Sequence, residues 1–169
     1  NQVADTVLRN SDWAVLALTL NIELVSQLHY RQSIEPDDQL SPLFKDLFLY
    51  HWKEESQHAI IDELEWVRHD DKLTPGERDK AIDELIGLFI AVDGIVKRQA
   101  AADARYFAAN RSGRADQADA KAIEAGFLEA YRWQFIHSGA GHPHFGKVLS
   151  SLTTPEQRLR IHTALAALH

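Results

Sequence analysis

The stretch from Trp13 to Leu28, WAVLALTLNIELVSQL, places apolar residues on every side of an α-helix and contains one charged residue, Glu23. A helix that is apolar all round is buried. Burying an ionised carboxylate without a partner costs on the order of several kcal/mol, so Glu23 must meet a cation, a metal or a hydrogen-bond network, or be protonated. The simplest alternative to a functional role is an ion pair with an Arg or His of a neighbouring helix.

Helix-period patterns continue along the rest of the chain, and three later helix starts carry an N-cap Ser or Thr followed by Pro. These starts are Ser41-Pro42, Thr74-Pro75 and Thr154-Pro155. The patterns predict long helices over 11–33, 42–69, 75–110 and 116–137, a kink near 93–94, a turn at 110–114 and a short last helix. Strand signals are essentially absent. We therefore expect an all-α protein, an antiparallel four-helix bundle with a short extra C-terminal helix.

The composition is typical of one soluble globular domain over residues 1–169, with 45% apolar and 25% charged residues. The net charge of -7 argues against nucleic acid as a partner. No apolar run approaches the ~20 residues of a membrane span, and no leader opens the chain, so a cytoplasmic protein is expected. The sequence contains no Cys, which leaves carboxylates and imidazoles as ligands for any metal.

The predicted second helix contains a Glu and a His, residue types that commonly bind metal ions. Its residues 50–59 are YHWKEESQHA. Glu55 and His58 are three positions apart, so they stand on one helix face and can bind the same ion or adjacent ions. Glu23 lies about 15 residues before the loop centre near Asp38, and Glu55 about 17 residues after it. In an antiparallel hairpin, Glu23 and Glu55 then lie at the same depth.

The buried Glu on the first helix and the Glu-Glu-x-Gln-His-Ala run on the second resemble the ferritin-like di-metal carboxylate superfamily, which includes non-haem di-iron oxidases and oxygenases. The resemblance implies that Glu23 is a terminal or bridging carboxylate, Glu55 a bridging carboxylate and His58 an imidazole ligand. It also implies that Glu54 orients an imidazole. Two Fe ions, or two Mn ions, and no organic cofactor are the cofactors expected from it.

The second half of that family pattern is altered, because no Glu-x-x-His follows residue 58. Glu23 precedes Glu55 and His58 by 32 and 35 positions, and Asp103 precedes Gln134 and His137 by 31 and 34. Asp103 and His137 are therefore the candidate second ligands. Gln134 would replace the bridging Glu, which weakens a site because an amide oxygen carries no negative charge.

Asp93 and Glu129 form a rival pair for the second half-site. Asp93 is the one charged residue in 85–96, and Glu129 lies at matching depth across the turn near Ser112. This pair fits an antiparallel hairpin better but places Arg132 where a His is needed. The structural alternatives are that Asp93 lies at a kink and that Glu129 pairs with Arg132. The sequence also lacks Met and begins at Asn1, so we expect it to be trimmed or to lack residues, which would alter the long spacings.

Three functions are consistent with these features. The first is a non-haem di-iron or di-manganese oxidase or oxygenase that activates dioxygen to oxidise a small organic substrate, with an electron donor as partner. The second is a metal-degenerate helical bundle that acts as a binding or scaffold domain. The third is a mononuclear site made by Glu23, Glu55 and His58. A homodimer is also considered, because bundles with an exposed apolar face commonly dimerise.

Overall fold

The computed structural model describes residues 2–110 and 117–168, and every regular element in these ranges is a helix, which confirms the all-α prediction. Four helices are long: α2 (Asp12–His29), α3 (Pro42–Asp70), α4 (Pro75–Asn110) and α5 (Gln117–Arg132). The shorter elements are α1 (Gln2–Val7), α6 (Ser138–Ala140), α7 (Pro143–Leu152), α8 (Pro155–Ala166) and the π-helical turns η1 (Tyr30–Ile34) and η2 (Trp133–His137).

The helix starts expected from Ser-Pro and Thr-Pro pairs are confirmed. The hydroxyl of Ser41 accepts a hydrogen bond from the backbone N–H of Phe44. Thr74 caps α4 in the same way, and the Glu77 carboxylate accepts from the Thr74 backbone in return. Thr154 and Gln157 form the corresponding capping box of α8. Each cap satisfies backbone N–H groups that a helix start leaves without an intrahelical partner.

The structure differs from the expected helix pattern at several places. Helix α4 continues through 93–94 without interruption, and α5 changes to a π-helical turn after Arg132. Two helices, α7 and α8, follow α6 where one was expected, because His142 caps a helix that Pro143 begins. The expected turn at 110–114 and the expected helix start at 116 lie mostly or wholly outside the described residues.

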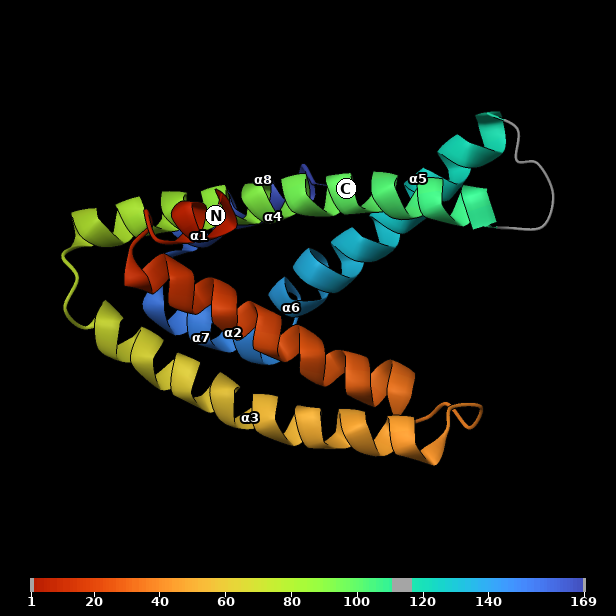
Figure 1. Cartoon of the computed structure of the whole chain (residues 1–169). Coiled ribbons are helices and arrows are strands. Elements are labelled where there is room, and N and C mark those ends of the chain that lie inside the picture. The colour runs from red at the N-terminus through yellow and green to blue at the C-terminus, as the bar shows by residue number, and fades with distance from the viewer. Residues whose placement is uncertain (1, 111–116, 169) are drawn as a thin grey trace.

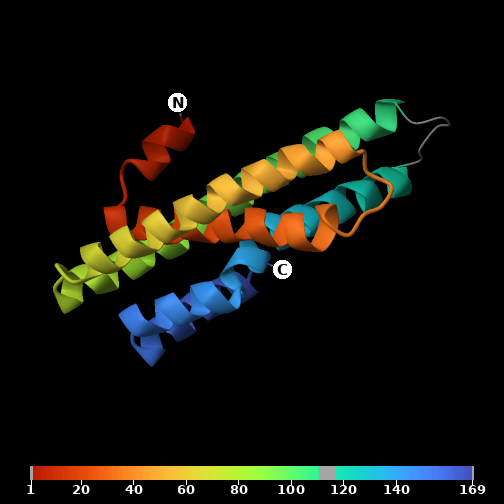
Figure 2. The ribbon, with the colours of Figure 1, turned by 90° about the horizontal axis from the view of Figure 1, so that it is seen from below.

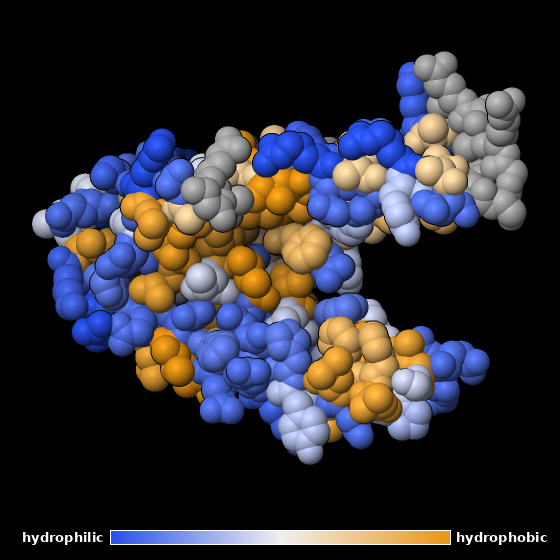
Figure 3. All heavy atoms as spheres, viewed as in Figure 1, coloured by the Kyte–Doolittle hydropathy of each residue, from blue (hydrophilic) through white to orange (hydrophobic). Residues whose placement is uncertain are grey.

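The long helices form two antiparallel pairs, α2 with α3 and α4 with α5 (Figure 1). Helix α2 is central, because it packs against α3 and against α4. Helices α3 and α5 lie apart, and the space-filling view is hollowed between them (Figure 3). Helices α7 and α8 lie on one side of the α2/α4 pair and α1 lies on the other (Figure 2).

The hydrophobic core lies where the two pairs converge. Trp66 of α3 packs edge-on against Trp13 of α2, with ring centroids 5.1 Å apart, and stacks on Phe145 of α7 at 5.7 Å. These three aromatic side chains are at most 1% exposed. The core therefore holds the α2/α3 pair together at one end, and the candidate ligands lie farther along this pair.

Of the helices described, none combines the length and the apolar character needed to cross a membrane.

Candidate metal centre

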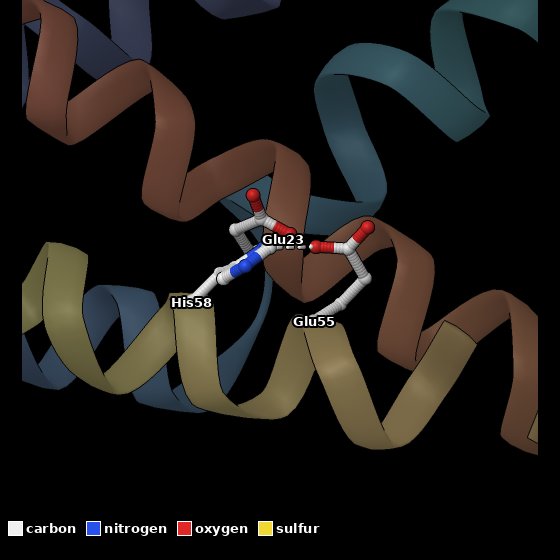
Figure 4. A group of neighbouring side chains, drawn as sticks. All are labelled: Glu23, Glu55 and His58. Atoms are coloured by element: carbon white, nitrogen blue, oxygen red, sulfur yellow. Dashed lines mark hydrogen bonds and ion pairs between the residues drawn. The ribbon is translucent and has the colours of Figure 1, made fainter. Parts of the chain in front are cut away.

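Glu23, Glu55 and His58 meet between α2 and α3. Each offers a ligand atom, and these atoms lie within 4.8 Å of one another. Glu23 points from α2 toward Glu55 and His58, which project from α3 (Figure 4). They are the one group of three or more potential metal ligands found in residues 2–110 and 117–168. The antiparallel hairpin thus places Glu23 and Glu55 at the same depth.

The Glu55 carboxylate lies between two imidazoles of α3. Its Oε2 is 2.8 Å from Nδ1 of His58, and its Oε1 is 3.2 Å from Nδ1 of His51. The Glu55 side chain is 16% exposed, whereas the two imidazoles are about half exposed. The centre is therefore accessible from solvent on the histidine side and covered on the carboxylate side.

The two carboxylates titrate differently because they are close. Burial, and then the hydrogen bond to Glu55, raise the pKa of Glu23 to about 8. The same hydrogen bond lowers the pKa of Glu55. The hydrogen bond to Glu55 also raises the pKa of His58. Glu23 is consequently protonated at neutral pH in the absence of a cation, and a bound cation would favour its ionised form.

Asp62 is a further carboxylate of this face that the sequence interpretation missed. Burial raises its pKa, a hydrogen bond to the Thr19 side chain opposes that shift, and its negative charge contributes to the raised pKa of Glu23. The signal was present in the sequence, because Asp62 lies four residues after His58 and so on the same helix face. Asp62 thus adds a third carboxyl group close to Glu23 and Glu55.

Asp103 and His137 lie outside the Glu23/Glu55/His58 group. The Asp103 carboxylate accepts a 2.6 Å hydrogen bond from the Tyr131 hydroxyl and a 2.8 Å bond from the Gln99 amide. Both hydrogen bonds lower the pKa of Asp103, and the bond from Tyr131 has the larger effect. Asp103 thus links α4 to α5. His137 ends η2, and its carbonyl accepts from the Gly141 backbone.

Asp93 and Glu129, the rival pair, also lie outside this group. Asp93 is 3% exposed and is contacted by Arg132 Nε at 2.7 Å and by Lys97 Nζ at 2.6 Å. Glu129 is exposed on α5. Arg132 pairs with Asp93 instead of with Glu129, so the buried charge in α4 is neutralised by an ion pair between α4 and α5.

A small cavity of about 180 Å³ lies between α2, α3 and the two π-helical turns. It is lined by residues that flank Glu23 on α2, by His51 and by side chains of both π-helical turns. The lining residues are Ile22, Val25, Ser26, His29, Tyr30, Phe48, His51, Trp52, Gln134 and Phe135. An apolar cavity of ~150 Å³ holds a benzene-sized molecule, so this space suits a small apolar one. π-Helical turns occur frequently at functional sites.

The chain was compared with protein-family models, curated proteins and solved structures, and none matched. Two carboxylates and one imidazole provide oxygen and nitrogen donors of the kind that bind Fe(II), Mn(II) or Zn(II). With no Cys in the chain, thiolate ligation is excluded.

Proposed function

We propose that this chain is a non-haem metalloprotein that binds Fe(II), or alternatively Mn(II), through Glu23, Glu55 and His58, and that it oxidises a small organic substrate with dioxygen. The observation that carries the proposal is the convergence of these three donors within 4.8 Å from two helices. A relationship to the ferritin-like di-metal carboxylate proteins is part of the proposal. The paired helices and the carboxylate-imidazole donor set support it.

The residues fit such an ion by charge and by donor type. Two ionised carboxylates would balance a divalent charge, and His58 supplies a neutral nitrogen donor. When bound, Fe(II) would supply the capacity to bind and reduce dioxygen, with further electrons from a donor protein. His51 contacts Glu55 and would hold its carboxylate in place. Asp62 would provide a further carboxyl group beside the ion.

Substrate binding is proposed for the 180 Å³ cavity. The aromatic and aliphatic side chains among its walls would contact the apolar part of a substrate. Trp52 lines the cavity, and within the described residues its buried indole N–H has no hydrogen-bond partner. A polar group of the substrate would satisfy that donor. Ile22 and Ser26 flank Glu23 on α2, which places the substrate beside the ligands.

The donor set favours one ion per chain over two, because three donors converge and Asp103 and His137 lie outside the group. Dialysis of the chelator-treated protein against Fe(II) without oxygen, or against Mn(II), followed by elemental analysis, measures this. We expect about one ion per chain and its loss in Glu55→Ala. The control Glu65→Ala removes a carboxylate of the same helix that pairs with Arg68, and should retain the ion.

Other stoichiometries distinguish the remaining functions. Absence of bound metal in the wild-type protein would contradict the proposal and support a binding or scaffold domain. Two ions per chain would support the di-metal form, and His137→Ala would then test the second half-site. Oxygen uptake by the Fe(II)-loaded protein with a chemical reductant tests the oxidase part separately. A metal-bound protein that consumes no oxygen would retain the metal site and refute the activity.

A homodimer is also proposed. Apolar side chains are exposed along the outer face of α3, namely Leu43, Leu47, Tyr50, Ile61 and Leu64, with exposed fractions from 56% to 81%. Covering such a face with a second copy would remove this area from water. Sedimentation velocity at several concentrations measures the mass in solution.

A further inference from the structure

A second and larger cavity lies between α1, α2 and α4, and Ile22 lines both cavities. The volume of the larger cavity is about 430 Å³, which falls in the ~300–1,000 Å³ range of small-molecule pockets. The walls are aliphatic over most of their area, with Leu18, Ile22, Leu88, Val92 and Ile95 among them. Figure 3 shows hydrophobic side chains gathered between α2 and α4 on the visible face.

Arg98 is the one charged residue among the described residues that line this cavity. Its guanidinium extends back along α4 over Gly94, where a Cβ would lie 3.7 Å from Nη1. Because Gly94 has no side chain, the guanidinium reaches the rim of the cavity one helical turn before its own Cα. The cavity therefore combines an aliphatic interior with a positive charge at its edge.

The carboxylates of α4 nearest to Arg98 in sequence are engaged elsewhere. Asp93 is paired with Arg132 and Lys97, and Asp103 accepts from Tyr131 and Gln99. The charge of Arg98 is thus available to a ligand anion. An aliphatic wall and a cation at its rim are complementary to a molecule with an apolar chain and a terminal carboxylate.

We propose that this cavity binds a medium-chain fatty carboxylate, with its carboxylate on Arg98 and its chain between α2 and α4. At ~30 Å³ for each small heavy-atom group, comparable to the volume of one liquid water, the cavity corresponds to about a dozen such groups. Decanoate has that size. A fatty alcohol has the same chain but no charge, and an alkyl phosphate has the same chain with a different anionic headgroup. These two compounds separate the contribution of the chain to the binding affinity from that of the carboxylate.

Isothermal titration of the full chain with decanoate, decanol and decyl phosphate tests the proposal. We expect saturable 1:1 binding of decanoate that is about twofold to fivefold tighter than that of decanol, as for an exposed charge pair. Tighter binding of decyl phosphate than of decanoate would overturn the assignment to a carboxylate. Arg98→Gln should weaken decanoate binding by the same factor and leave decanol binding unchanged. The control Arg105→Gln alters an exposed cation of the same helix outside the cavity and should change neither.

Ala91→Phe places a ring in the cavity and should abolish the binding of all three compounds, with circular dichroism verifying the fold. Since Arg98 is exposed, Arg98→Gln remains informative if the filled variant does not fold. Absence of saturable decanoate binding, or decanoate binding unchanged by Arg98→Gln, would overturn the proposal. A third result would also overturn it: a wild-type protein that binds no decanoate and forms a dimer that Ala91→Phe disrupts. The cavity would then be a subunit interface.

Discussion

Glu23 and Glu55 show how two acids in contact divide their protonation. Both ionised forms cannot persist side by side in the partly buried space between α2 and α3, so the pKa of Glu23 rises to about 8 while that of Glu55 falls. The hydrogen bond between them is satisfied with one proton. The same pair would become a dianionic ligand set if the proposed divalent cation replaced that proton.

This titration predicts that the metal-free protein loses stability as the pH rises. The folded state holds a proton on Glu23 up to about pH 8, whereas the unfolded chain releases it near 4.5, so the contribution of Glu23 is lost between those values. The raised pKa of His58 acts in the same direction above its ordinary value of 6.5. With chelator present, we expect Tm to fall by on the order of 5 °C from about pH 5.5 to about pH 8.5.

Glu23→Gln provides the comparison for that pH profile. It keeps the size and hydrogen-bonding capacity of the side chain and removes its titration, so the fall in Tm should become shallower. The lowered pKa of Glu55 acts only at the acidic end, where stability is lost as the pH falls through the folded pKa. Parallel profiles for the two proteins would show that Glu23 is ionised at neutral pH without metal.

Gly139 is a residue at which the packing leaves no room for a side chain. A Cβ there would lie 2.5 Å from the backbone oxygen of Asn21 and 2.6 Å from its Oδ1. Gly139→Ala should therefore destabilise the fold by about 1–3 kcal/mol, because α6 must move away from α2. The matched control is Gly126→Ala in α5, where no atom lies within 4 Å of the new Cβ.

The control substitution should act in the opposite direction. Gly126 lies within an exposed helix, so Ala in its place should stabilise the protein by about 0.5–1 kcal/mol through helix propensity. Urea unfolding followed by circular dichroism measures both variants. Equal effects of the two substitutions would exclude the close approach of α6 to α2 as the cause.

At the scale of the elements, Asp70 joins three helices at the end opposite to the open side. Its Oδ1 accepts from the indole N–H of Trp13 in α2 at 2.8 Å, and Arg78 of α4 donates to both carboxylate oxygens at 2.7 and 2.8 Å. Asp70 itself ends α3 and is 6% exposed. The α2, α3 and α4 ends are thus held by one buried carboxylate.

Asp70→Asn should weaken this junction by about 2–3 kcal/mol, because Arg78 loses its ionic partner while an amide replaces one acceptor by a donor. The exposed neighbour Asp71 supplies the control, and Asp71→Asn should change stability by less than about 0.5 kcal/mol. Chemical denaturation of both variants makes the comparison. A loss of equal size at both positions would argue against the junction.

At the scale of the whole molecule, the proposed ion would connect α2 to α3 where the hairpin is open to solvent on one side. A ligand that binds only the folded state stabilises it by RT ln(1 + [L]/Kd), which is ~2.7 kcal/mol at a hundredfold excess over Kd. We expect Mn(II) to raise Tm in a concentration-dependent manner. Differential scanning calorimetry of the wild-type protein and of Glu55→Ala measures the effect.

In Glu55→Ala the dependence on Mn(II) should vanish, and Glu65→Ala should retain it. A Tm that rises equally in all three proteins would reveal nonspecific binding to the acidic surface, which carries a net charge of -7. A Tm unaffected by Mn(II) and by Fe(II) would contradict the proposed centre. Helix α3 lies apart from α5 and packs mainly against α2. An ion bound between α2 and α3 would therefore stabilise the position of α3.

The sequence by itself predicted the long helices and the three residues that meet between α2 and α3. N-cap residues followed by Pro are local signals, so three helix starts were predictable. The lone charge in the apolar stretch and the Glu55/His58 spacing, together with a short hairpin connection, predicted that Glu23 meets Glu55. These inferences needed only the geometry of one helix and one turn, which short-range sequence patterns encode.

Only the tertiary structure decided which side chains of α5 contact those of α4. The spacing of Asp103, Gln134 and His137 could not show that Tyr131 binds Asp103, because that contact depends on how α5 rotates against α4. Burial of Asp93 was predictable, but its partner Arg132 was not. The two cavities likewise arise where helices diverge, and the angle between packed helices is set by side chains distant in sequence.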